Sequence, residues 1–338
     1  MKARVGVVGY GVIGQRLADG VSRQKDMELI GVADIAPTLA LRALVEQDAP
    51  YKLYCPITSG VSALENAGIP VSGSLEDLLA ECDIILDSTS AGVGLRNKEI
   101  YQAHNLKAIF QGGEKSDVAD VFFHGCANYD SGLGKNFLKL TSCNTTGLIR
   151  AIDCLDRLVG VERVIITIMR RVADPGDSHR GLTDVALVEP APNHQALDLM
   201  HIMPHIEATG LLVHLPITHG HIISVIATLK KTVSKDTVLE RFQAHPRIRV
   251  VKIADGFNSN AALFRYARDL GHKRGDMYDI ALFEETLVFS GREIIFAINI
   301  PQEAVVTPET MDGVRASLEM QTNREEAMNR TDAYLGLK

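Results

Sequence analysis

The chain begins with the stretch that decides its fold, Arg4-Val5-Gly6-Val7-Val8-Gly9-Tyr10-Gly11-Val12-Ile13-Gly14. An apolar strand pattern runs directly into the spacing GxGxxG, and apolar residues then recur at helical spacing. The first glycine, Gly9, permits a tight turn; Gly11 lets the backbone approach a pyrophosphate; and Gly14 lets helix and strand pack closely. The stretch therefore predicts a βαβ unit that binds a dinucleotide at a helix N-terminus.

A carboxylate follows the second predicted strand, Glu28–Ala33. Asp34 lies about 20 residues beyond Gly14, where an acidic side chain accepts hydrogen bonds from a ribose 2′-hydroxyl and repels a 2′-phosphate. The alternative is an ordinary solvated aspartate in a loop. Asp34 predicts that NAD is the preferred cofactor and that NADP is possible.

The pattern of strand and helix continues through the first 140 or so residues, about the length of one domain. Further strands are expected at 83–86 and 107–110, with a helix at 74–79 whose Ser74 and Asp77 resemble a capping box. Polar, glycine-rich turns at 88–92 and 111–114 follow these strands and are expected to line the cofactor cleft. This half is predicted to be an α/β Rossmann domain with a doubly wound parallel sheet.

The second half has a different pattern, with longer strands of β-branched residues between fewer helices. This predicts an α+β catalytic domain with a mainly antiparallel sheet. Strands are expected at 164–169, 211–215, 222–229 and 294–298, and helices at 237–243 and 260–270. Thr307-Pro308-Glu309 then predicts the start of a C-terminal amphipathic helix that returns to the first domain.

The length and composition favour a soluble globular protein of two domains. The 338 residues are 46% hydrophobic and 23% charged, and the net charge of -7 without a basic run argues against nucleic-acid binding. No apolar stretch reaches the roughly 20 residues that span a membrane, and no signal peptide is recognisable, so a cytoplasmic location is expected. The five cysteines form no CxxC pair, which predicts reduced thiols and no metal site.

One of these cysteines is placed for chemistry. Cys143 lies in Ser142-Cys143-Asn144-Thr145-Thr146-Gly147, between a predicted strand at 136–140 and a helix expected from Asn144 onward. Backbone N–H groups and the helix dipole favour an anion at such a place, which predicts a lowered thiol pKa and a nucleophilic thiolate. The alternative is a small buried side chain.

A thiolate beside a nicotinamide domain suggests oxidation of an aldehyde through a thiohemiacetal and a thioester. This chemistry needs a base, and His194, His219 and His221 are candidates; His221 opens a strongly apolar strand. Arg170 and Arg171 end another strand and offer two positive charges to phosphate oxygens.

These motifs resemble the archaeal-type, or type II, phosphorylating glyceraldehyde-3-phosphate dehydrogenases over the whole chain. The marks of the resemblance are Gly9-Tyr10-Gly11, Phe110-Gln111-Gly112-Gly113-Glu114-Lys115, Ser142–Leu148, Arg170-Arg171 with Ala173-Asp174-Pro175, and Pro301-Gln302-Glu303. The resemblance implies a homotetramer, a Cys143 nucleophile and His221 as its base partner. It also implies substrate contacts at Ser142 and Asn144, and cofactor contacts at Val12, Ile13, Gly113, Arg171 and Gln302.

Two positions depart from the family pattern. Where the family commonly has Ser-His-His-Gly-Pro-Asp, this chain has Asn193-His194-Gln195-Ala196-Leu197-Asp198, so His194 and Gln195 are carried over as substrate contacts from a changed loop. Where many members have a basic turn and accept NADP, this chain has Asp34. The expected domains are residues 1–142 with 303–338 for the dinucleotide, and 143–302 for catalysis.

The predicted reaction converts D-glyceraldehyde 3-phosphate, inorganic phosphate and NAD(P) to 1,3-bisphosphoglycerate, as in glycolysis or gluconeogenesis. Arg170 and Thr145 are assigned to phosphate oxygens. Two alternatives stay open at this point. One is another cysteine-dependent semialdehyde or acyl-phosphate dehydrogenase, and the other is a nucleotide-binding regulator without turnover.

Overall fold

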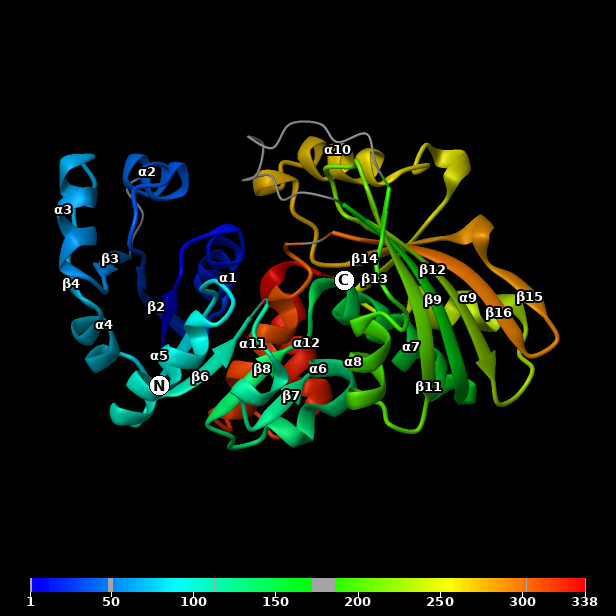
Figure 1. Ribbon diagram of the computed structural model, residues 1–338. Helices are drawn as coiled ribbons and strands as arrows, with labels where there is room; N and C mark the ends of the chain where they lie inside the picture. Colours follow the sequence, from blue (N-terminus) through cyan, green and yellow to red (C-terminus); the bar gives the residue numbers. More distant parts are fainter. Residues whose placement is uncertain (1, 48–50, 112, 172–185, 302, 338) are drawn as a thin grey trace. The chain divides into compact units, whose positions relative to one another are not determined.

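The computed structural model describes residues 2–47, 51–111, 113–171, 186–301 and 303–337 (Figure 1). The chain divides into two compact units, each with a β-sheet of its own. Unit 1 runs to Thr141 and resumes with Thr307–Gly336, and unit 2 contains Ser142–Val306.

Unit 1 is built on a parallel sheet of eight strands in the order β4-β3-β2-β1-β5-β6-β8-β7. The chain first moves outward from β1 to β4 and then restarts on the other side of β1 with β5, so the topological switch point lies between β1 and β5. Ligands of doubly wound sheets bind beyond the strand ends at such a point. The strands are β1 (Ala3–Val8), β2 (Met27–Ala33), β3 (Lys52–Cys55), β4 (Gly73–Ser74), β5 (Ile84–Asp87), β6 (Lys107–Phe110), β7 (Val121–Phe123) and β8 (Phe137–Leu140).

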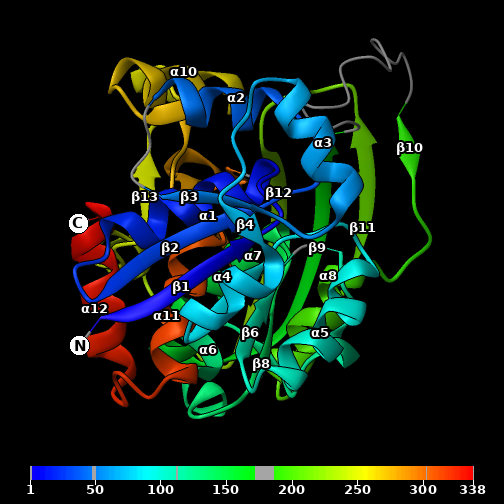
Figure 2. The same cartoon turned by 90° about the vertical axis from the view of Figure 1, so that its left-hand side faces the viewer.

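Helices cover both faces of this sheet, as Figures 1 and 2 show. Alternate strand residues point to opposite faces. Leu86 of β5 therefore joins one apolar cluster with Leu17 and Met311, while Ile85 joins another with Leu78 and Tyr101. The helices are α1 (Val12–Arg23), α2 (Leu39–Glu46), α3 (Thr58–Asn66), α4 (Leu75–Glu81), α5 (Val93–Ala103), α6 (Gly125–Asn128), α11 (Thr307–Ser317) and α12 (Arg324–Leu335).

The last two helices belong to unit 1 although they come from the far end of the chain. Every residue of α11 is buried. Arg315 of this helix, with a fully buried side chain, donates to both carboxylate oxygens of Asp26, at 3.0 and 2.7 Å, and to Thr331 of α12 at 2.6 Å. A paired, fork-shaped contact of this kind fixes the position of α11 as well as its charge.

Unit 2 contains a mixed, mainly antiparallel sheet with the path β10-β11-β9-β12-β16-β14-β13, and β15 pairs with β16. The pairs β9–β11 and β13–β14 are parallel, and the other pairings are antiparallel. The strands are β9 (Val161–Arg171), β10 (Leu187–Val188), β11 (Glu207–Leu215), β12 (His221–Leu229), β13 (Ile248–Val251), β14 (Ile280–Phe283), β15 (Val288–Ser290) and β16 (Glu293–Ile300).

One face of this sheet is buried and the other is partly exposed. Along β12 every second residue from His221 to Leu229 is buried, and the residues between them are partly exposed. This alternation is typical of a sheet covered on one side. α7 packs against β12 and also contacts α8 and α9. The helices of unit 2 are α7 (Cys143–Val159), α8 (His194–Ile202), α9 (Lys235–Gln243) and α10 (Asn260–Asp269).

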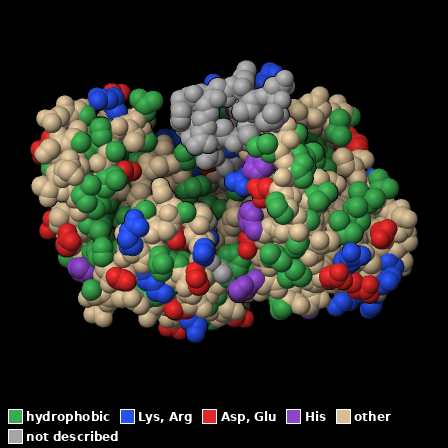
Figure 3. Space-filling model, viewed as in Figure 1, with side chains coloured by type: hydrophobic (Ala, Val, Ile, Leu, Met, Phe, Trp, Pro, Cys, Tyr) green, Lys and Arg blue, Asp and Glu red, His purple; other side chains and the backbone are tan. Residues whose placement is uncertain are grey.

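The predicted fold class, a Rossmann domain followed by an α+β domain with a mainly antiparallel sheet, is confirmed. In the described ranges no helix is both long and apolar enough to cross a bilayer. Acidic and basic side chains are interspersed over the face drawn in Figure 3.

Candidate active site

Cys143 is the first residue of α7, one position earlier than the helix start expected from the sequence. Ser142 is the N-cap, and its hydroxyl accepts a hydrogen bond from the Thr145 N–H at 3.4 Å. The Thr145 hydroxyl in turn donates to Asp198 of α8 at 3.1 Å. The N-cap thus marks the start of a 17-residue helix and places Cys143 in its first turn.

His221 is the histidine that the structure brings to the thiol. Its Nε2 lies 3.8 Å from Cys143 Sγ, and its ring is fully buried at the start of β12. The backbone N–H of Arg171, on the neighbouring strand β9, donates to Nδ1 at 3.2 Å. Because Nδ1 accepts this bond, the proton of the neutral ring is assigned to Nε2, which faces the sulfur as a donor.

The protonation states differ from the prediction of a lowered thiol pKa, which is wrong. Burial among neighbouring atoms raises the pKa of Cys143 to about 11, and this outweighs the opposing effects of Arg170 and the Asn144 N–H. Burial, together with Arg170 and Arg171, lowers the pKa of His221 to about 3. At neutral pH the pair is therefore a thiol and a neutral imidazole.

The same geometry does not support the role of general base predicted for His221. The lone pair of the neutral ring is directed to the Arg171 N–H, and a second ring proton would have to displace that bond. Nε2–H is instead placed to donate to a thiolate or to an oxygen that gains negative charge. His219 was another candidate, and its ring packs against Phe264 at a centroid distance of 4.0 Å.

The two arginines have separate surroundings although they are adjacent. Neighbouring residues of a strand point to opposite faces. Arg171 is nearly buried, forms an ion pair with Glu303 at 2.7 Å and donates to the Thr218 carbonyl at 3.3 Å. Arg170 is partly exposed and lies opposite His214 in the register with β11. Of the two, Arg170 is the more accessible to an anion.

Two buried amides contribute polar atoms near the starts of helices. Asn144 in α7 and Gln195 in α8 are each 1% exposed, and among the described residues Asn144 Oδ1 and Gln195 Oε1 have no hydrogen-bond partner. An orphaned buried oxygen is costly and is most easily explained by a polar group that binds there. His194, the neighbour of Gln195, is exposed.

Unit 1 carries the residues predicted to bind the cofactor. Gly9 has a φ of 88°, and a Cβ added to Gly14 would lie 1.9 Å from the Gly9 carbonyl oxygen, so neither position tolerates a side chain. A Cβ on Gly11 would meet nothing within 4 Å, which leaves room for a pyrophosphate at the N-terminus of α1. Val12 and Ile13 follow in the first turn.

The other predicted cofactor residues are only partly accounted for. Asp34 directly follows β2, and its carboxylate accepts from the Tyr10 N–H at 2.8 Å and the Ile35 N–H at 2.7 Å. It therefore fixes the glycine loop as well as marking the expected ribose position. A Cβ on Gly113 would lie 3.2 Å from Ala91, in the turn after β5. Gln302 and Ala173-Asp174-Pro175 lie outside the described residues.

Two residues near the thiol had no role in the prediction. Glu303 neutralises Arg171, and Asp198 receives the Thr145 hydroxyl. Glu303 and Asp198 both belong to motifs noted in the sequence, but the motifs do not indicate which residues they contact. Each partner lies on an element far away in the sequence, so only the fold brings the pairs together.

Family models and solved structures match this chain. Residues 142–267 match the family Glyceraldehyde 3-phosphate dehydrogenase, C-terminal domain, and residues 3–113 match Dihydrodipicolinate reductase, N-terminus. A solved aspartate semialdehyde dehydrogenase II from Vibrio cholerae has a TM-score of 0.62 at 12% identity, with 94% of this chain and 99% of that chain covered. At this identity the likeness concerns the fold alone.

Curated relatives are closer in sequence. Glyceraldehyde-3-phosphate dehydrogenase of Hyperthermus butylicus is 39% identical, with 99% of this chain and 98% of the relative covered. The proteins of the same name from Methanosarcina mazei and Sulfolobus acidocaldarius are 36% and 38% identical, with 100% and 99% of this chain and 100% and 97% of each relative covered. Similarity of this extent includes both units and implies a nicotinamide cofactor. The chain belongs to the glyceraldehyde-3-phosphate dehydrogenase family.

Proposed function

We propose that the protein oxidises D-glyceraldehyde 3-phosphate to 1,3-bisphosphoglycerate with inorganic phosphate and NAD(P). The observation that carries this proposal is the contact between Cys143 Sγ, at the start of α7, and the buried Nε2 of His221, 3.8 Å away. Membership of the family supports the substrate. The same relatives make a nucleotide-binding regulator or another semialdehyde dehydrogenase the weaker alternative.

The reaction begins when the Cys143 thiol loses its proton to solvent or to a dianionic phosphate. The thiolate adds to the aldehyde carbon, and the carbonyl oxygen becomes an alkoxide. His221 Nε2–H donates to that oxygen, and the Cys143 N–H and the Asn144 side-chain amide are the further donors we assign. The bound nicotinamide supplies the chemistry of hydride acceptance, which leaves a thioester on Cys143.

Inorganic phosphate then attacks the thioester carbon. A bond forms between the phosphate oxygen and the acyl carbon, and the C–S bond breaks. The electron pair of that bond returns to Cys143 as a thiolate, and the acyl phosphate leaves. We assign phosphate contacts to Arg170 and to Ser142, Thr145, His194 and Gln195 around the starts of α7 and α8. The accessible charge of Arg170 supports this assignment, and in Gln195 the side-chain NH₂ group is the donor for a phosphate oxygen.

For the cofactor we propose that NAD is preferred over NADP. Asp34 follows β2, where its negative charge opposes a 2′-phosphate. Asp34→Asn removes the charge while an amide oxygen can still accept from a backbone N–H. We expect this variant to lower the ratio of kcat/KM with NAD to kcat/KM with NADP. A wild-type enzyme that prefers NADP contradicts the proposal.

We further propose a cytoplasmic homotetramer. The dinucleotide-binding domain is assigned to residues 1–142 with 303–338, and the catalytic domain to 143–302. We assign further cofactor contacts to Gly113 in the first domain and to Arg171 and Gln302 in the second. The family resemblance supports the tetramer, and sedimentation of the purified protein measures it directly.

The proposed function is tested by following NADH formation from glyceraldehyde 3-phosphate, aspartate semialdehyde and N-acetylglutamate semialdehyde. We expect turnover with the first substrate, dependence on phosphate, and a loss of at least about 1,000-fold in Cys143→Ser with NAD binding retained. Cys154→Ser removes a buried thiol elsewhere in unit 2 and is the matched control. Preference for another aldehyde identifies a different dehydrogenase, and a wild type without turnover identifies a regulator.

A further inference from the structure

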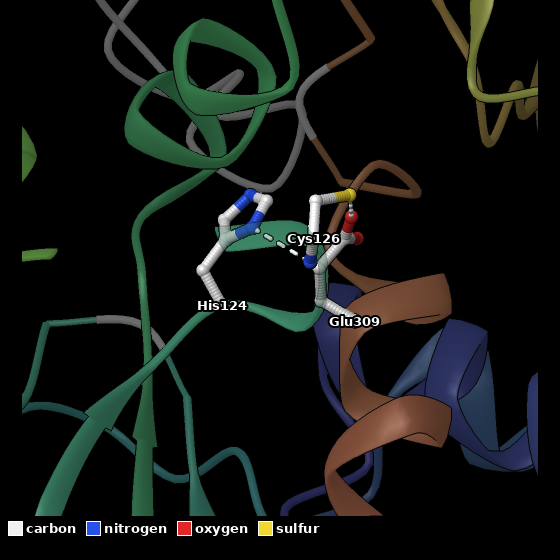
Figure 4. A group of neighbouring side chains, drawn as sticks. All are labelled: His124, Cys126 and Glu309. Carbon is white, nitrogen blue, oxygen red and sulfur yellow. Dashed lines mark hydrogen bonds between the residues drawn. The ribbon is translucent and has the colours of Figure 1, made fainter. Parts of the chain in front are cut away.

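Three side chains with different ligand chemistry meet in the interior of unit 1 (Figure 4). His124 is the N-cap of α6, Cys126 lies in the first turn of that helix, and Glu309 lies in the first turn of α11. Their exposed fractions are 0, 1 and 0%. One ligand atom from each, a ring nitrogen, Sγ and a carboxylate oxygen, lies within 4.8 Å of the other two.

Each residue also has an ordinary structural role. His124 Nδ1 accepts from the Cys126 N–H at 3.2 Å, and an acidic side chain such as Glu309 suits the N-terminus of a helix. These roles do not require an imidazole, a thiol and a carboxylate to share one buried space.

We propose that His124, Cys126 and Glu309 bind one Zn²⁺ ion or a similar divalent cation. Nitrogen, thiolate sulfur and carboxylate oxygen are the ligands that Zn²⁺ takes in proteins, with a fourth position for water. Ligand distances of about 2.0–2.3 Å in a tetrahedral site place ligand atoms about 3.3–3.8 Å apart. The ligand atoms lie within 4.8 Å of one another, so on metal binding the most distant pair would move together by at most about 1 Å to reach 3.8 Å.

Binding also changes local bonds in a defined way. The Cys126 thiol gives up its proton to solvent as the metal–sulfur bond forms. A neutral imidazole ligand binds through one nitrogen and keeps a proton on the other. His124 must therefore release the Cys126 N–H, because an Nδ1 that binds metal or carries a proton cannot accept it. The hydrogen bonds from the Cys126 N–H to His124 and from the Cys126 S–H to Glu309 are lost, and three metal–ligand bonds form.

The site joins the start of α6, directly after β7, to α11. Cys126 and Glu309, whose Sγ and Oε1 are 4.0 Å apart, are separated by 183 residues. This separation explains why the sequence predicted no metal site, since that prediction rested on the absence of closely spaced cysteine pairs. The inference concerns unit 1 and does not depend on the proposed catalytic function.

The test is a titration of the full-length chain with Co²⁺, after treatment with a chelator. Cys143→Ser is used as the background because the Cys143–His221 pair could itself bind a soft metal. We expect one equivalent of Co²⁺ to produce sulfur-to-cobalt charge-transfer absorption, and Zn²⁺ to displace it. His124→Asn on this background keeps a side-chain oxygen to cap α6, and we expect affinity to fall by more than about 100-fold.

Cys126→Ala is the second variant and should abolish the charge-transfer band. Cys82→Ala, which removes another buried thiol of unit 1, is the control and should leave the band unchanged. Far-ultraviolet circular dichroism confirms that each variant is folded. The proposal is overturned if the background protein gives no such band, or if the band persists in folded His124→Asn and Cys126→Ala.

Discussion

At position 221, one backbone hydrogen bond decides which ring nitrogen carries the proton. The protonated nitrogen is the one that faces the Cys143 thiol. Arg171 N–H occupies Nδ1 of His221, so Nε2–H is a donor toward Cys143. The alkoxide formed at the aldehyde needs such a donor, whereas it does not need a base once the thiolate has attacked. The sequence singled out the histidine that lies beside Cys143 but gave no information about its tautomer.

This arrangement predicts different effects for two substitutions of His221. His221→Ala removes the donor, and we expect kcat to fall by about 100 to 1,000-fold. His221→Gln retains an N–H donor but is no base, and it should lose markedly less activity. Steady-state kinetics with saturating phosphate measure both variants. Equal losses in the two variants indicate that His221 does transfer a proton.

The raised pKa of Cys143, to which the charge of Glu303 contributes, predicts how the reactivity of the thiol depends on pH. Because the folded-state pKa of Cys143 is about 11, the thiolate fraction should rise about tenfold per pH unit between pH 7 and 10. The charge of Glu303 raises this pKa, so Glu303→Gln should lower it. The pH dependence of Cys143 alkylation by iodoacetamide measures both values. A wild-type rate that is level above pH 7 contradicts the raised pKa.

At the scale of elements, two glycines at the start of α1 serve different purposes: Gly11 leaves space for the cofactor, and Gly14 allows close packing. We expect Gly11→Ala to fold normally but to bind NAD at least about tenfold more weakly, because its new methyl group enters the open space. Gly14→Ala should destabilise the protein by about 1–3 kcal/mol, because its methyl group meets the Gly9 carbonyl oxygen. Calorimetric titration and chemical denaturation distinguish the two effects. Similar stability of both variants would show that the loop rearranges freely.

Elements with strong local signals could be predicted from the sequence. The capping box of Ser74 and Asp77 is present at the start of α4, and β6 has the predicted bounds. α12 was not predicted because its apolar residues do not form one clear face, and contacts with α11 hold it instead. The capped start of α7 was predicted within one residue, whereas the raised pKa of Cys143 was not, since burial depends on distant elements.

At the scale of the whole molecule, unit 1 depends on a segment from the other end of the chain. Arg315 links α11 to Asp26, and both partners are largely removed from water. We expect Arg315→Ala to reduce the free energy of unfolding by about 3 kcal/mol, because the largely buried Asp26 carboxylate loses its closer cation and keeps Arg330, 3.6 Å away. Urea denaturation measures this change. Arg292→Ala, which breaks an exposed pair with Glu162, is the control and should cost less than about 1 kcal/mol.

The discontinuous composition of unit 1 also has a consequence for synthesis on the ribosome. Its first segment, up to Thr141, leaves the exit tunnel long before Thr307–Gly336 is made. At about 5–20 residues per second, the intervening Ser142–Val306 takes on the order of ten seconds or more to translate. During that time the apolar surface that α11 will cover is open to nascent-chain chaperones. Apart from the last two residues of the chain, unit 2 is one segment, Ser142–Val306, and it can fold before unit 1 is complete.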